Sequence, residues 1–327
     1  MIYIESDSRD PYFNLALEEY VFEHFDRTEE YFLLWQNANT IVVGKFQNTA
    51  EEVNQEFVDK NKIKVARRLS GGGAVYHDDG NLNFTYIVDQ GDRDLFSFEA
   101  FAAPIIRALK TFGLDAEFTG RNDLLLEGKK ISGSSQYVKK GRIMNHGCIM
   151  LDSNVANVAD ALKPKAAKFE SKSIKSVRSR VTTINANLME PISMDTFKAA
   201  IVKEIEGSEN MRRYTLTEED RQAIEKLRSE KYATWDWNYG RSPVYDYKQE
   251  RKFDFGLVSV NAQIKQGVIE EIRIFGDFFG NGDIQELEAS LAGEKLDDGF
   301  GARIERKINL EHYIKGMTGQ QLQELLR

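Results

Sequence analysis

The chain has 327 residues, of which 41% are hydrophobic and 29% charged, and its formal net charge is −8 at neutral pH. The length suggests two domains, and the acidic balance argues against binding of nucleic acid by the chain as a whole. The sequence has no run of 18 apolar residues and no basic leader, so we expect a cytoplasmic protein with no transmembrane helix and no membrane partner. Because it has one cysteine, Cys148, we expect no intrachain disulfide.

The first 65 residues predict a helix, two strands and a second, polar-faced helix. The first helix has Asp10 as its expected N-cap and Pro11 at its first position. The helix face expected to be buried carries Phe13, Leu17, Tyr20, Val21 and His24. Apolar strand signals follow at residues 31–35 and 40–44, and residues 50–62 have the pattern of a helix.

Hairpin and meander signals dominate residues 74–152. The tetrapeptide Asp78–Asn81 is typical of a hairpin turn and predicts pairing between strands at 74–77 and 83–88. A helix over 97–112 is expected to end at Gly113, although Pro104 lies inside it. Alternating residues interrupted by glycines then predict a meander with strands at 123–127, 129–132, 136–139 and 142–152.

The rest of the chain predicts two more helices and a separate small module. The helices are expected at 193–206 and 217–231, and Thr217 with Asp220 has the pattern of a capping box. A boundary near residues 239–243 suggests domains at 1–245 and 246–327. The second domain should hold strands at 253–264 and 268–275 and helices after them. Because hairpins dominate and no βαβαβ rhythm occurs, the predicted fold class is α+β.

A glycine-rich block at residues 67–78 carries the strongest chemical signal. Its three consecutive glycines let a ligand approach the backbone and let successive N–H groups converge on an anion. Arg67 and Arg68, before the glycines, supply planar donors suited to phosphate or carboxylate. The block is neither a Walker A loop, since no Gly-Lys-Ser/Thr follows, nor a dinucleotide-binding fingerprint, since it leads into a strand. A tight structural turn is the alternative.

Two basic segments give weaker signals. Lys130 could point its ammonium group into a cleft, with Asp123 as a partner for a cation, although solvated turns would account for the same residues. The segment Lys163–Arg180 holds seven basic residues against one acid, Glu170. It could close over a phosphate, dock an acidic protein partner, or be a solvated loop.

Cys148 is the one residue that could carry an acyl group as a thioester. It lies in an apolar strand pattern, which predicts a buried and unreactive thiol. His146 would share its strand face, so a Cys–His dyad stays open. The residues by themselves therefore indicate an anion-binding α+β enzyme, and they do not specify its reaction.

A set of segments matches one known family in the same order along the chain. The segments are Pro11–Glu19, Leu34–Asn37, Val43–Asn48, Arg67–Asp78, Gly80–Phe84, Asn122–Asp123, Lys130–Ser134, His146–Gly147 and Ser176–Thr182. In these segments the sequence resembles the bacterial lipoate–protein ligases. The Arg-Arg-x-Ser-Gly-Gly-Gly-Ala-Val-Tyr-His-Asp block is the most specific of them, and the C-terminal module matches more loosely.

The resemblance implies a biotin/lipoate ligase-like (class II synthetase-like) catalytic domain with mixed, largely antiparallel sheets, plus a small α+β accessory domain. It implies that Mg²⁺-ATP and free lipoate give lipoyl-adenylate, and that a carrier lysine then accepts the lipoyl group and releases AMP. The implied catalytic residues are Lys130, Asp123 and Arg68, with Asp123 also as the Mg²⁺ ligand. The implied ATP- or adenylate-binding residues are Arg68, Gly71, Gly72, Gly73, Ala74, Val75, Tyr76, Asn81, Lys130, Arg178 and Arg180. The implied lipoate-binding residues are Trp35, Arg68, Gly72, His77, Lys130, Ser132, Gly133, His146 and Gly147.

The resemblance also implies a monomer whose partners are E2 subunits of 2-oxoacid dehydrogenases or the glycine-cleavage H protein. The main alternative is a thiol-dependent octanoyl or lipoyl transferase of the same superfamily, which would use Cys148 and no ATP. The accessory domain and the apolar surroundings of Cys148 favour a ligase. A non-catalytic binder of lipoyl nucleotide is a third reading, which the intact Arg68, Lys130 and Asp123 disfavour.

Overall fold

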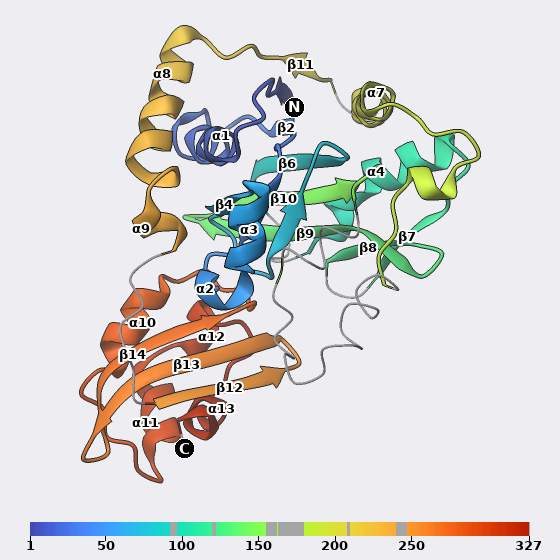
Figure 1. Cartoon of the computed structure of the whole chain (residues 1–327). Helices are drawn as coiled ribbons and strands as arrows, with labels where there is room; N and C mark the ends of the chain where they lie inside the picture. The colour runs from blue at the N-terminus through green and yellow to red at the C-terminus, as the bar shows by residue number, and fades with distance from the viewer. Residues whose placement is uncertain are drawn as a thin grey trace. The chain divides into compact units, whose positions relative to one another are not determined.

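The computed structural model describes residues 1–91, 97–119, 122–154, 162, 180–207, 210–239 and 247–326. The chain divides into two compact units, which are described separately (Figure 1). Unit 1 consists of Met1–Val43, Thr49–Arg67 and Ala74–Asn238, and unit 2 of Gly44–Asn48, Arg68–Gly73 and Tyr239–Arg327. The boundary expected between residues 245 and 246 lies in a segment outside the described residues and stays a prediction. No helix in the described ranges has the length and apolar character needed to cross a membrane.

The centre of unit 1 is an eight-stranded sheet with the order β11-β1-β2-β6-β10-β9-β8-β7. Its strands are β1 (Ile2–Glu5), β2 (Tyr31–Trp35), β6 (Asn81–Asp89), β7 (Ala116–Thr119), β8 (Asp123–Leu126), β9 (Lys129–Lys139), β10 (Arg142–Met150) and β11 (Arg212–Arg213). β1 is parallel to β2 and β11, and the other described pairs in this sheet are antiparallel. The predicted α+β class with mixed, largely antiparallel sheets is therefore confirmed.

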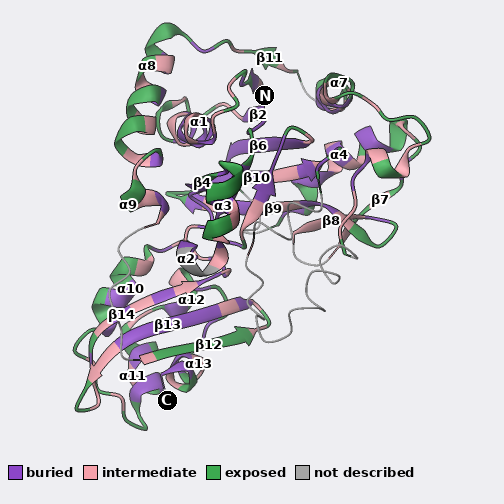
Figure 2. Cartoon of the chain, viewed as in Figure 1, coloured by how far each residue is buried: buried purple, intermediate pink, exposed green. Residues whose placement is uncertain are grey.

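Helices cover both faces of this sheet. On one face, α4 (Glu99–Thr111) and α7 (Met194–Glu206) form a single apolar core with alternate residues of β2, β6 and β10. The opposite face lies against α1 (Pro11–His24), and α8 (Glu218–Leu227) packs against α1 in turn. Figure 2 shows that β6, between these layers, is almost wholly buried and that the outward side of α8 is exposed.

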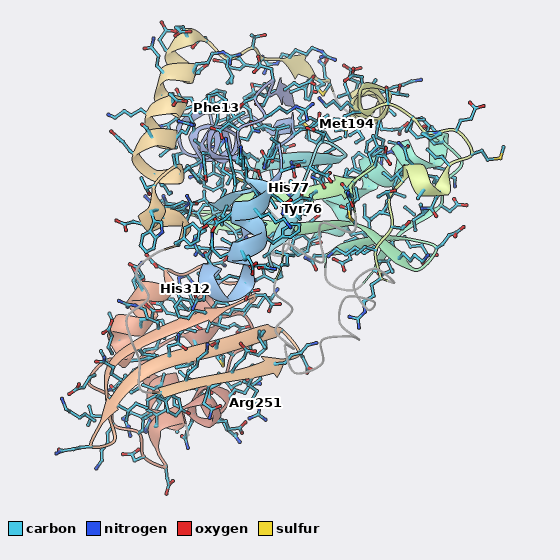
Figure 3. All side chains as sticks on the ribbon, viewed as in Figure 1. Phe13, Tyr76, His77, Met194, Arg251 and His312 are labelled. Atoms are coloured by element: carbon cyan, nitrogen blue, oxygen red, sulfur yellow. The ribbon has the colours of Figure 1, made fainter. Side chains whose placement is uncertain are left out.

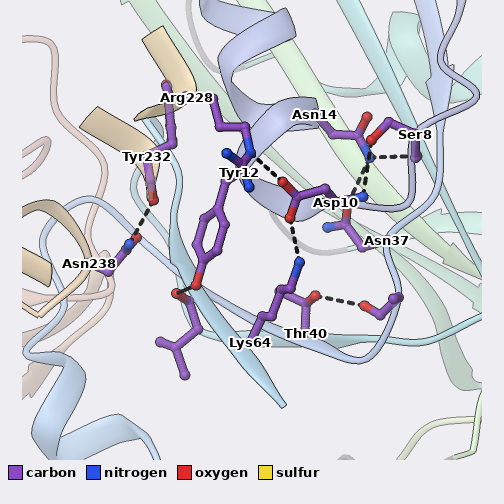
Figure 4. A network of polar contacts seen from close by, with 12 residues as sticks. Ser8, Asp10, Tyr12, Asn14, Asn37, Thr40, Lys64, Arg228, Tyr232 and Asn238 are labelled. Carbon is purple, nitrogen blue, oxygen red and sulfur yellow. Dashed lines mark hydrogen bonds and ion pairs between the residues drawn. The ribbon is translucent and has the colours of Figure 1, made fainter. Parts of the chain in front are cut away.

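The first helix begins at Pro11 as predicted, but Asp10 does not cap it. Its carboxylate instead forms ion pairs with Lys64 at 2.6 Å and with Arg228 at 2.5 Å (Figure 4). Burial alone would raise the pKa of Asp10, but the hydrogen bonds from these two cations outweigh it and lower the pKa below its ordinary value. Asp10 therefore ties the start of α1 to two distant segments.

The buried face of α1 also differs from the predicted one. Leu17 and Val21 are buried as expected, whereas His24 is exposed. Asn14 and Glu18, two polar residues, are almost completely buried in the same helix. Apolar periodicity could not indicate them, because their burial depends on polar partners far away in the sequence.

The hairpin predicted around Asp78–Asn81 is wrong, although the turn itself forms. β5 (Val75–His77) joins a separate three-stranded sheet with the order β4-β3-β5, in which β3 is Thr40–Val43 and β4 is Lys64–Arg67. The carboxylate of Asp78 accepts hydrogen bonds from the backbone N–H of Gly80 at 3.0 Å and of Asn154 at 2.8 Å. The turn is thus bound to the chain that follows β10, and β6 continues beside β10 and not beside β5.

Several predicted helices of unit 1 are confirmed. α4 forms with Pro104 inside it, α7 follows the N-cap Ser193, and Thr217 with Asp220 forms the capping box of α8. The helix predicted at 50–62 is two short helices, α2 (Thr49–Glu52) and α3 (Gln55–Asn61). The remaining short elements are η1 (Asn185–Asn187), the π-helical turn η2 (Arg228–Tyr232) and α9 (Trp235–Asn238).

Unit 2 has its own core, built on a three-stranded antiparallel sheet. The strands are β12 (Tyr247–Phe253), which was not predicted, β13 (Gly256–Lys265) and β14 (Val268–Gly276). Gln266 and Gly267 join β13 to β14, and both have positive φ, as a tight hairpin requires. The helices are α10 (Ile284–Leu291), α11 (Phe300–Lys307), α12 (Leu310–Tyr313) and α13 (Gly319–Leu325).

Candidate active site

A row of opposed residues runs across five strands of the large sheet. Trp35 of β2 opposes Asn83 of β6, and Asn83 opposes Cys148 of β10. Cys148 in turn opposes Gly133 of β9, and Gly133 opposes Asp123 of β8. Directly opposed residues of neighbouring strands point to the same face of a sheet. These five residues, which we call the cross-strand row, therefore share one face.

Lys130 reaches this face through an irregularity in β9. Leu124 opposes Ser132, but the next residue of β8, Leu125, opposes Lys130, so β9 contains one extra residue at this point. Such a bulge shifts the alternation of side chains along the strand. Lys130 and Gly133, an odd number of residues apart, consequently lie on the same face.

The ammonium group of Lys130 lies at the Asp123 end of the row. Its Nζ is 2.7 Å from Oδ1 of Asp123, and a Cβ placed on Gly133 would be only 2.8 Å from the same Nζ. Any side chain at position 133 would therefore displace the lysine. Two hydrogen bonds join Asn122 to Ser134. The backbone N–H of Ser134 donates to the carbonyl of Asn122, and Nδ2 of Asn122 donates to the carbonyl of Ser134. These bonds hold the start of β8 against β9.

The end of the basic segment pairs with the backbone of Lys130. The N–H of Lys130 donates to the carbonyl of Arg180 at 2.8 Å, and the N–H of Thr182 donates to the carbonyl of Lys130 at 3.0 Å. Arg180 itself is exposed. Arg178, the other predicted adenylate-binding arginine of this segment, lies outside the described residues, as does the rest of 163–179.

A buried chain of hydrogen bonds ends at Trp35, the other end of the row. Nε1 of Trp35 donates to Oγ1 of Thr85 at 2.9 Å, and this hydroxyl donates to Oε1 of Glu18 at 2.5 Å. The same carboxylate oxygen lies 2.8 Å from Nδ1 of His146. All four residues are at least 95% buried. Glu18 was not among the predicted site residues, and the one sequence signal was its place in the first matching segment.

His77 extends this network from the smaller sheet of unit 1. Its Nδ1 lies 3.2 Å from Nδ2 of Asn37, and its ring meets that of Trp35 edge-on with 6.3 Å between the ring centres. Figure 3 shows His77 next to Tyr76, on β5. The structure therefore brings three predicted lipoate-binding residues together, His77, Trp35 and His146.

Ser132 and Gly147, two further predicted lipoate-binding residues, lie on the other face of the sheet. Ser132 opposes Ile149, which belongs to the core under α4 and α7. A Cβ placed on Gly147 would stand 2.6 Å from Cζ of Phe84, which belongs to the same core. Their side-chain positions are thus directed away from the cross-strand row.

Cys148 is partly buried and not fully enclosed, so the prediction of a buried thiol is wrong. The reason lies in its cross-strand neighbour Gly133, which has no side chain to cover it. On its other side Cys148 is flanked by Asn83. The cysteine therefore lies within the row and not in the apolar core.

The triglycine loop and Arg68 belong to unit 2. The guanidinium group of Arg68 donates to Oγ of Ser70 at 3.0 Å and to the carbonyls of Gly71 at 2.6 Å and Gly73 at 2.9 Å. These bonds fold the arginine back over its own loop and fix the loop conformation. Gly72 has φ of 88°, a value that favours glycine. Ala74, Val75 and Tyr76, which continue the predicted nucleotide-binding block, are in unit 1.

Neighbouring glycines allow close packing around this loop. A Cβ on Gly44 would be 2.1 Å from the carbonyl oxygen of Gly72, and a Cβ on Gly71 would be 2.3 Å from that of Phe278. Phe46 stacks on Phe278 with ring centres 4.8 Å apart. The start of the triglycine loop, Gly71 and Gly72, is therefore packed by backbone contacts that a larger residue at position 71 or 44 would prevent, whereas Gly73 is exposed.

The described residues contain no group of three or more His, Cys, Asp or Glu side chains that could hold a metal ion. Asp123, the predicted Mg²⁺ ligand, is paired with Lys130. A single carboxylate suits Mg²⁺ when phosphate oxygens of a substrate and water supply the other ligands. The donor set thus fits a metal that arrives with a nucleotide, and it does not form a resident metal cage.

Family models match most of the chain. Residues 10–206 match the model described as the lipoyl protein ligase A/B catalytic domain, and residues 242–326 match the bacterial lipoate protein ligase C-terminus. Among curated proteins, lipoate-protein ligase LplJ of Bacillus subtilis is 42% identical over 330 residues, with all of both chains covered. Lipoate–protein ligase 1 of Staphylococcus aureus is 45% identical over 317 residues, with 97% of each chain covered.

Solved structures show the same fold. P. falciparum LipL1, determined in complex with lipoate, has a TM-score of 0.79 at 24% identity, with 94% of each chain covered. A lipoate-protein ligase A determined with bound ATP has a TM-score of 0.64 at 26% identity and covers 73% of this chain and 98% of its own.

Proposed function

The chain belongs to the lipoate–protein ligase family, and we propose that it attaches free lipoate to carrier proteins in two steps. In the first, the carboxylate of lipoate attacks the α-phosphorus of ATP, and lipoyl-adenylate and pyrophosphate form. In the second, the amine of a carrier lysine attacks the acyl carbon, an amide forms and AMP leaves. The energy of ATP is needed because a free carboxylate is a poor acyl donor.

The observation that carries this proposal is the length and chemistry of the cross-strand row. Gly133 lies beneath Nζ of Lys130, and the distance from Gly133 to Trp35 across the sheet is three strand spacings, or about 14 Å. Lipoate has a five-membered dithiolane ring at the end of a chain whose five C–C bonds span about 6 Å. A carboxylate beside Lys130 would place the ring toward Trp35. The row thus has the cation of Lys130 at one end, followed by Gly133, which leaves room for a chain, and the aromatic ring of Trp35 at the other end.

Lys130 is the proposed electrostatic catalyst of both steps. Its ammonium group would balance the charge that develops on the phosphate and on the acyl oxygen in the transition states. Asp123 orients the lysine in the absence of substrate, and in our proposal it then contacts Mg²⁺ or the incoming amine. Exclusion of water by the segment around Arg180, which pairs with the Lys130 backbone, would protect the adenylate from hydrolysis.

The nucleotide side of the site rests on the glycine-rich block. We propose that Mg²⁺-ATP, a substrate and not a resident cofactor, binds to Arg68, the triglycine loop and the Ala74–Tyr76 backbone, with Asn81 at the adenine. Arg178 and Arg180 would contact the phosphate. Trp35, His77 and His146 would bound the dithiolane end, with Gly133 giving room for the chain, and Ser132 and Gly147 would contribute backbone only.

The proposed carriers are E2 subunits of 2-oxoacid dehydrogenases or the glycine-cleavage H protein. We propose that the protein modifies them as a monomer and in the cytoplasm. The basic segment Lys163–Arg180 supports these carriers, because a local positive patch on an acidic chain suits a negatively charged carrier surface. The experiment is incubation of a purified carrier domain with the protein, lipoate and Mg²⁺-ATP, followed by intact-mass spectrometry. We expect one lipoyl adduct, absent without ATP and absent when the carrier lysine is replaced by arginine. An adduct that forms equally well without ATP would refute the proposal.

A second candidate function is the thiol-dependent transferase, and the partly exposed position of Cys148 within the row favours it. In that reaction the cysteine thiolate would take an octanoyl or lipoyl group from an acyl donor and pass it to the carrier lysine. The two functions differ in the fate of Cys148→Ser. A ligase keeps its ATP-dependent activity in this variant, whereas a transferase loses acyl transfer.

A further inference from the structure

Asn83, in the middle of the cross-strand row, has a buried side-chain amide that makes fewer hydrogen bonds than it can. Its side chain is 99% buried. Its Oδ1 accepts a hydrogen bond from Nδ2 of Asn81 at 3.2 Å. Within the part of the chain that the structure describes, its Nδ2 has no hydrogen-bond partner. An unpartnered amide donor in a protein interior is costly, which points to a partner that arrives with a ligand.

The position of Asn83 relative to Lys130 identifies which part of a ligand it would meet. Gly133, beneath the lysine ammonium, and Asn83 are two strand spacings apart, about 10 Å. In lipoate, C6 lies five C–C bonds or about 6 Å from the carboxyl carbon, and a sulfur lies one bond farther. A lipoate whose carboxylate contacts Lys130 would therefore place its sulfur atoms, and not its methylene chain, beside the amide of Asn83.

The chemistry of the two partners is complementary. A thioether or disulfide sulfur is a weak hydrogen-bond acceptor, whereas a methylene or methyl group accepts none. Octanoate has the same chain length but no sulfur, so its binding would leave the Asn83 donor buried and unpaired. A site with a buried donor selects against ligands that cannot satisfy it. Cys148, opposite Asn83, is only partly buried.

We propose that Asn83 is a specificity-determining residue that recognises the dithiolane sulfur through its Nδ2 donor and makes the site prefer lipoate over octanoate. The inference rests on the proposed ligase function and adds to it the choice between two acyl substrates.

The test compares kcat/KM for lipoate and for octanoate in pyrophosphate release. The variant Asn83→Leu removes the donor and keeps the branched shape of the side chain, although leucine is larger than asparagine. Asn145→Leu is the matched control, because Asn145 is also completely buried but lies on the neighbouring strand, where it opposes the core residue Tyr86. We expect the ratio of lipoate to octanoate kcat/KM to fall about tenfold in Asn83→Leu and to stay at the wild-type value in Asn145→Leu.

A general structural role of Asn83 would lower activity with both acids and leave the ratio unchanged, and this result would overturn the inference. A second measurement avoids variants altogether. The wild-type protein should use 7-thiaoctanoate, whose one sulfur is six bonds from the carboxyl carbon as in lipoate, several-fold better than octanoate, and equal use of the two would contradict the inference. Absence of pyrophosphate release with every acid would instead refute the proposed function itself.

Discussion

Replacement of Lys130 by alanine separates catalysis from folding. The ion pair of Lys130 with Asp123 is 38% and 34% exposed, and pairs of this kind contribute about 0–1 kcal/mol to stability. Removal of a donor that stabilises charge in a transition state costs about 2.7–4 kcal/mol, which corresponds to about a 10²–10³-fold lower rate. Lys130→Ala should therefore fold nearly as stably as the wild type and lose almost all lipoate-dependent pyrophosphate release.

The assay is steady-state pyrophosphate release with saturating ATP and lipoate, together with thermal unfolding of the same preparations. Lys129→Ala is the matched control, because Lys129 is the adjacent residue of β9 and is exposed. It should keep the wild-type rate. A Lys130→Ala variant that retains a rate within about threefold of the wild type, a change of only about 0.7 kcal/mol, would refute the role assigned to the lysine.

Three further predictions concern other parts of the chain. Asp10→Asn should lower the free energy of unfolding by about 1–2 kcal/mol at pH 7, because Asp10 loses two charged hydrogen bonds. Because the pKa of Asp10 is lowered in the folded protein, this stabilisation is present above the ordinary pKa of about 4 and is lost as the pH falls through the folded pKa. The free energies of unfolding of the wild type and of Asp10→Asn, measured by urea titration, should therefore converge at low pH. Cys148→Ser should retain ATP-dependent lipoylation within about threefold, and complete loss in a folded protein would revive the thioester mechanism. Reversal of Lys172 and Lys175 to glutamate should slow transfer to the carrier and weaken its salt dependence without changing pyrophosphate release, whereas an unchanged transfer rate would exclude docking through these charges.

Local signals in the sequence predicted most helices and many of the strands, because these depend on nearby residues. The Thr217–Asp220 pair forms a capping box as predicted, α7 forms within the range expected for it, and the Gln266–Gly267 turn joins its two strands. The turn at Asp78–Asn81 also forms, but a turn does not specify which strands will pair after it. Long-range pairing placed β5 and β6 in different sheets.

The residue types of the proposed site come from the sequence, whereas their geometry could not be predicted from it. Lys130 and Gly133 share a face through a bulge that strict alternation along β9 would exclude. Glu18 and His146 are 128 residues apart, and their contact depends on α1 packing on the sheet. Cys148 was expected in the core because its neighbours along the strand are apolar, whereas its exposure is set by Gly133 across the strand pair.

The most direct test of the central claim is a search for the acyl-adenylate itself. The wild-type protein is incubated with lipoate and Mg²⁺-ATP without any carrier, and the reaction is analysed for pyrophosphate and for lipoyl-AMP by mass spectrometry. We predict pyrophosphate release that requires lipoate, together with lipoyl-AMP retained on the protein. Lipoylation of a carrier from an acyl-carrier-protein donor through Cys148, with no pyrophosphate and no adenylate formed from lipoate and ATP, would contradict the account.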